Sequence, residues 1–198
     1  MTRPDFSVVG STVHACNKVV EYLAPILEGG SNEIDKVYKV ERHIGRFNTE
    51  QEVKHWMSRR DGGVRIAALN VVGYEKVGSA IIGSVNMAAY VFTGDVFSYE
   101  KDTRAEVIAG KLAAALMNKD ATPGCYSKPE AIRADNRYSK NIDDLGVAIW
   151  AVSWNQKWQL NVPIDPADLD DFIKFGLRGE LADGAPVLEG EVTLPQGE

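Results

Sequence analysis

The chain contains 198 residues, of which 44% are hydrophobic and 25% charged, and its net charge at pH 7 is −6. This composition is typical of a soluble globular domain, and the chain is long enough to bury a sizeable core without disulfides. No apolar run approaches the roughly 18 residues of a membrane span, and the N-terminus has too few apolar residues for a signal peptide.

The acidic charge is concentrated at the C-terminal end. Residues 159–198 contain two basic and nine acidic residues, whereas residues 1–158 contain twenty basic and nineteen acidic residues. Such a distribution lacks the positive surface that nucleic acids require, so we expect no specific nucleic-acid binding. The two cysteines, Cys16 and Cys125, have neither disulfide nor metal-ligand spacing, which favours a reducing compartment.

The first sixty residues predict two helices and a strand. Residues 10–28 repeat apolar side chains at helical spacing, and Ser11 or Thr12 can cap the start of that helix. Residues 34–40 alternate loosely between apolar and polar side chains, which indicates a half-exposed strand. A second helix is predicted to begin at Thr49 with a capping box.

The middle of the chain predicts a hairpin followed by a long helix. Residues 64–72 and 77–92 are strand candidates, and residues 73–76 between them are few enough for a hairpin turn. Residues 102–118 have the strongest helical pattern of the chain, with a wide stripe of alanine and larger apolar side chains. Thr103 and a glutamate three residues later predict a capping box at its start.

The stretch from Ala131 to Asn161 is the most strand-like part of the chain. It begins extended, turns in a polar segment, and then continues from Gly146 to Trp158 with mostly apolar, β-branched or aromatic side chains. Both faces of this strand are largely apolar up to Ser153, so we expect a central strand that is covered on both sides.

Beyond residue 160 the pattern is irregular. Four prolines interrupt the segment, in which we expect a helical turn within residues 165–172 and a final edge strand at residues 192–194. The sequence therefore predicts an α/β protein of the α+β kind: a single domain with a mixed sheet flanked by helices. Its core comprises residues 1–160, and residues 161–198 form an acidic extension that packs on the core or on a neighbouring subunit.

No catalytic signature is present in the sequence. His14, His43 and His55 fall in separate predicted elements without a companion at ligand spacing. The acidic run of residues 165–171 contains a proline and lacks the glycine of a calcium loop, so it is better explained as the start of a helix. We therefore expect no catalytic residue, no cofactor and no metal, and a protein that is not an enzyme.

Five residues are candidates for an interface. Arg42 and Arg46 could bind a phosphate or an acidic partner surface, although a solvated face with ordinary ion pairs explains them equally well. Trp158 follows a polar stretch and is the tryptophan that we expect to be exposed. Phe172 and Phe175 are large apolar residues of the extension, where a disordered segment would not need them.

Several stretches of the chain resemble the Mu-like phage tail terminator family, in the same order along roughly residues 60–195. These are Met87-Ala88-Ala89-Tyr90-Val91 with the alanine-rich helix after it, Asn136-Arg137-Tyr138-Ser139, Asp144-Leu145-Gly146-Val147-Ala148-Ile149-Trp150-Ala151-Val152-Ser153-Trp154-Asn155-Gln156, Asp170-Asp171-Phe172, and Val192-Thr193-Leu194-Pro195.

The resemblance implies a small α/β subunit of a homo-oligomeric ring, commonly a hexamer, at the head-proximal end of a contractile tail. Its partners would be the tail tube and sheath proteins and the neck or connector proteins, and DNA would pass through the ring without specific binding. The protein would be made in the host cytoplasm and reside in the virion.

Two alternatives remain open from the sequence. One is another neck or tail-completion protein of the same particle. The other is a small-ligand-binding or enzymatic α/β domain that uses Arg42, His43 and Arg46.

Overall fold

The computed structural model describes residues 6–30, 32–44, 53, 62–118, 124–163, 174–179 and 188–193, the last two ranges as backbone only. The chain divides into two compact units, Met1–Val162 and Pro163–Glu198. This division lies two residues after the expected boundary between core and extension.

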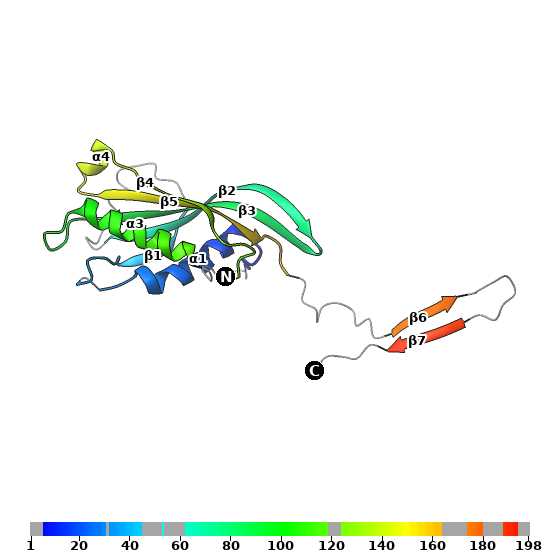
Figure 1. Ribbon diagram of the computed structural model, residues 1–198. Helices are drawn as coiled ribbons and strands as arrows, with labels where there is room; N and C mark the ends of the chain where they lie inside the picture. Colours follow the sequence, from blue (N-terminus) through cyan, green and yellow to red (C-terminus); the bar gives the residue numbers. More distant parts are fainter. Residues whose placement is uncertain are drawn as a thin grey trace, which may run out of the picture. The chain divides into compact units, whose positions relative to one another are not determined.

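The first unit contains a mixed five-stranded sheet in the order β1-β2-β3-β5-β4, which confirms the predicted α+β class (Figure 1). The strands are β1 (Lys39–Arg42), β2 (Gly63–Val77), β3 (Ala80–Thr93), β4 (Glu130–Asn136) and β5 (Ala148–Gln159). β1 is parallel to β2, and the other neighbours are antiparallel. The middle strand is β3, so β5 is an interior strand but not the central one.

Helices α1 (Thr12–Leu27) and α3 (Lys101–Met117) pack on one face of the sheet. α1 lies against β1 and β2, and α3 lies against β3, β4 and β5. The backbone N–H of His14 donates to the Ser11 side chain at 3.3 Å, which confirms the expected cap of α1. The predicted helix from Thr49 lies outside the described residues apart from Val53, which is helical.

The main core lies between these helices and the sheet. Val152, Trp154 and Trp158 of β5 alternate along the strand and are at most 2% exposed. On the opposite face a smaller cluster contains Val53, Phe92, Val147 and Ile149. β5 is therefore covered by apolar groups on both faces only in its first half, and Asn155 is exposed on the second.

Two predicted boundaries were wrong. The strand expected at residues 34–40 begins only at Lys39, because hydrogen bonds from Glu33 to Gly30 and from Lys36 to Glu33 fold the preceding residues into turns. The hairpin turn lies not at residues 73–76 but at Gly78 and Ser79, where Gly78 has a φ of 61°. Glycine adopts this left-handed conformation without strain. β2 therefore ends five residues after its expected end, and β3 begins three residues after its expected start.

The predicted capping box of α3 was also wrong. The helix begins at Lys101, and its N-cap residue, Glu100, makes no side-chain capping bond. Instead the Asp95 carboxylate accepts a hydrogen bond from the Lys101 backbone N–H at 2.8 Å, and the Thr93 hydroxyl donates to the Lys101 carbonyl at 2.7 Å. The loop after β3 therefore fixes where α3 begins.

A buried arginine connects α3 to the turns that precede β1. Arg104 is 4% exposed and donates hydrogen bonds to the carbonyls of Ile34 at 2.9 Å and Gly94 at 2.7 Å. A buried guanidinium needs such acceptors, because a buried charge without hydrogen-bond partners would lower the stability by several kcal/mol. Its role is to hold three segments together.

The second unit, considered by itself, contains an antiparallel pair formed by β6 (Lys174–Gly179) and β7 (Leu188–Thr193). The expected strand at residues 192–194 overlaps β7, whereas β6 was not predicted. The expected helical turn at residues 165–172 lies outside the described residues.

Two glycine substitutions should change stability in opposite directions. Gly62 has a φ of 82°, and a Cβ there would collide with the Phe92 carbonyl oxygen, so Gly62→Ala should destabilise the protein by more than about 1 kcal/mol. Gly110 lies exposed in α3 with nothing close to its Cβ position, so Gly110→Ala should stabilise by about 0.5–1 kcal/mol. Urea unfolding measures both, and equal stability of the two variants would contradict the structure.

The ion pair between Lys111 and Asp35 should make a small, pH-dependent contribution to stability. Hydrogen bonding to Lys111 lowers the pKa of Asp35 below its ordinary 3.8. The contribution is therefore present above pH 4 and is lost as pH falls through the lowered pKa. Asp35→Asn should cost about 0.2–1 kcal/mol at pH 7, with the difference shrinking in acid unfolding curves. Asp135→Asn is the control, because Asp135 has no ion pair among the described residues.

Candidate assembly surface

The longest hairpin of the sheet extends beyond the helices that cover it. β1 pairs only with Gly63 to Ile66 of β2, and past Ile66 none of the described strands lies along the outer edge of β2. Figure 1 shows the β2–β3 hairpin extending away from α1 and α3. We call residues 67–84 the arm.

The arm carries an unusual number of exposed apolar side chains. Its charged residues are Glu75 and Lys76 alone. The exposed apolar residues are Leu69 (49%), Val72 (66%), Tyr74 (66%), Val77 (46%) and Ile81 (41%). Two of them, Leu69 and Val72, lie at register shifts where β2 has one residue more than β3. Such bulges turn side chains outward, and clustered exposed apolar groups mark interaction sites.

The opposite edge of the sheet has a different character. β4 carries Glu130, Arg133 and Asp135, all exposed. It also has a register shift in which Ala131 has a φ of 52°. Charges and irregular pairing prevent association through an edge strand. The two edges therefore differ, and the arm is the one suited to a protein contact.

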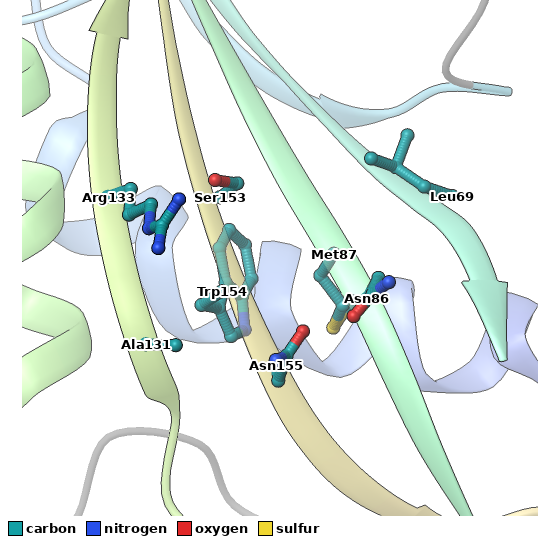
Figure 2. Close-up of a pocket in the computed structure, with 8 residues that line it drawn as sticks. All are labelled: Leu69, Asn86, Met87, Ala131, Arg133, Ser153, Trp154 and Asn155. Carbon is teal, nitrogen blue, oxygen red and sulfur yellow. The ribbon is translucent and has the colours of Figure 1, made fainter. Parts of the chain in front are cut away.

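A shallow hollow of about 330 Å³ lies on the sheet face opposite α1 and α3 (Figure 2). Asn86 of β3 pairs with Asn155 of β5, and both line the hollow beside Leu69 and Arg133. The side chains of Asn86, Asn155 and Arg133 make no hydrogen bond to any other described residue. The hollow therefore offers one positive charge and two free amides, which suits binding rather than proton transfer.

A second hollow of about 230 Å³ lies at the base of the arm, lined by Tyr74, Ile82 and Ser84 among others. Beside it Lys157 of β5 forms an ion pair of 2.7 Å with Glu75 of β2, across β3. Hydrogen bonding to Glu75 raises the pKa of Lys157, so Lys157 keeps its positive charge at neutral pH. This pair ties the arm to the interior strand.

Three of the five predicted interface residues lie in the described part of the chain. Arg42 is exposed at the end of β1. Trp158 is 1% exposed, so the expectation that it is the exposed tryptophan was wrong: its ring lies on the face of β5 that packs under the helices. Phe175 lies in β6, and Arg46 and Phe172 lie outside the described residues.

The structure describes two of the three histidines. His14 is half-buried in α1 and His43 follows β1, while His55 lies outside the described residues. In the described part of the chain, no three His, Cys, Asp or Glu residues are grouped so that they could hold a metal ion. None of the described helices is long and apolar enough to cross a membrane.

The arm was missed at the sequence level. The signal available was the uncharged run from Ala67 to Tyr74, followed by the Gly78-Ser79 turn.

A comparison with known protein families and with curated protein sequences finds no match for this chain.

Trp154 and Trp158 should respond differently to the same substitution, although both are buried on the same face of β5. The Trp154 Nε1–H donates to the Gln156 Oε1 at 3.2 Å, whereas the Trp158 Nε1–H has no partner among the described residues. Trp154→Phe leaves the buried Oε1 of Gln156 without its donor and should cost about 1–3 kcal/mol more than Trp158→Phe. Urea unfolding measures the difference, and identical losses would show that the hydrogen bond contributes nothing.

Proposed function

We propose that the protein is a tail terminator of a contractile-tailed phage. It forms a ring at the head-proximal end of the tail, stops polymerisation of tube and sheath, and joins the tail to the neck. The observation that carries the proposal is the ordered resemblance of residues 87–91, 136–139 and 144–156 to the Mu-like tail terminator family.

Two physical features of the chain support this proposal. A ring requires contacts between unlike surfaces that close on themselves, and the exposed apolar arm is suited to such a contact. A channel for DNA is expected to repel phosphate groups, and the excess of seven acidic residues in residues 163–198 could supply that repulsion.

Native mass spectrometry of the purified protein, and electron microscopy of the protein mixed with tail tubes, test the proposal. We expect a closed homo-oligomer that binds one end of each tube. A strict monomer that never associates with tube ends would contradict the proposal.

Particles assembled without the protein distinguish a tail terminator from a protein at another position in the same tail. A missing terminator should leave tails that are overlong or unstable, because nothing stops polymerisation. Tails of normal length without the protein would assign it to the neck instead.

A further inference from the structure

The arm is apolar on both of its faces. Tyr74 pairs with Gly83 and Ile81 follows the same alternation as the core residue Val85, so Tyr74 and Ile81 lie on the helix side of the sheet, beyond the helices. Leu69 lines the hollow on the opposite face, and Val77, paired with Ala80, alternates to that face as well. A partner that covers the arm must therefore contact it from both sides.

Counted together with Lys157 of β5, the arm has one positive charge in excess. Lys157 neutralises Glu75 through their ion pair, whereas Lys76 forms no ion pair with any described residue. Residues 163–198 contain two basic and nine acidic residues. Two such acidic segments repel each other, and each is attracted to a surface like that of the arm.

The two described strands of the C-terminal unit need further contacts to be stable. Its described part is one pair of six-residue strands, and an isolated two-stranded hairpin is marginal in water. In sequence Phe175 and Leu177 alternate with polar residues and glycine, and the register sets Phe175 opposite Val192. Such a hairpin needs a further strand or an apolar surface to pack on.

The chain enters the C-terminal segment from the arm itself. The Asn161 side chain accepts a hydrogen bond from the Ile81 N–H at 2.8 Å and donates to the Ser79 carbonyl at 3.2 Å. Residues 164–173 then precede β6, and ten residues can span up to about 35 Å. Neighbouring arms in a ring within that distance could exchange their C-terminal segments.

We infer that the arm is the docking site for the C-terminal segment, residues 164–198, of a second copy of this chain. The inference rests on the proposed function, because a ring needs a contact between unlike surfaces of neighbouring copies. Apolar contact on both faces of the arm provides the free energy of association. The acidic charge of the segment favours binding to the arm over binding to a second acidic segment.

Charged substitutions on the arm test whether it is the docking site. The full chain carrying Val72→Lys and Tyr74→Lys should fold normally, because both side chains are 66% exposed. Its self-association should weaken by about tenfold or more in sedimentation or native mass spectrometry, as two desolvated charges oppose docking. Val107→Lys with Met117→Lys is the matched control, because these exposed apolar residues lie on α3, away from the arm.

Cross-linking between different chains identifies the occupant. Chains with Val72→Cys are mixed with chains carrying Arg178→Cys or Glu191→Cys, one position in each C-terminal strand. All carry Cys125→Ser, whereas Cys16 is retained, because burial raises its pKa to about 11 and keeps it an unreactive thiol. We expect disulfides that join the two kinds of chain.

The outcomes separate the inference from the proposed function. Cross-links that form only when both cysteines are in one chain would show docking within a single copy and overturn the inference. Assembly that is unchanged by the arm substitutions would overturn it too, while leaving the terminator proposal intact. A wild-type protein that never self-associates would contradict both the inference and the terminator proposal.

Discussion

Burial of one face of β5 beneath the helix layer, in which α3 lies directly against it, is the constraint on which the first unit depends. Trp154, Gln156 and Trp158 lie on that face and are at most 2% exposed. The polar member, Gln156, accepts from Trp154 and donates to the Ser127 carbonyl at 3.1 Å. An unpaired buried amide would cost about 1–3 kcal/mol, so this network fixes both the strand and the loop before β4.

The arm follows from a difference in length between the layers. The 16 residues of α1 span about 24 Å as a helix, whereas the 15 residues of β2 span about 50 Å as a strand. A helix layer of that length covers only part of so long a hairpin. The remaining side chains of β2 and β3 stay uncovered unless another chain packs on them, which is why the exposed apolar residues gather beyond Ile66.

The parts of the fold that were predicted correctly are elements whose apolar side chains recur at regular spacing on one buried face. The α1 cap, the long helix α3 and the apolar faces of β5 follow from local periodicity. The errors arose where a distant partner decides the outcome. Asp95 and Thr93 cap α3 from the preceding loop, and Trp158 is buried by helices that its own flanking residues do not reveal. The arm escaped prediction for the same reason, since exposure depends on where the helices end.

The arm and the described C-terminal hairpin differ in how many strands support them. The β3 side of the arm is paired with β5 at Ile82 to Ser84, whereas the described part of the C-terminal unit is a pair of antiparallel strands. Three or more strands with a shared apolar face are the minimum for independent stability. If the hairpin of one copy packs on the arm of another, the hairpin gains the further apolar surface that it needs, and the exposed side chains of the arm are covered. Stability of the hairpin and association of the copies would then be coupled.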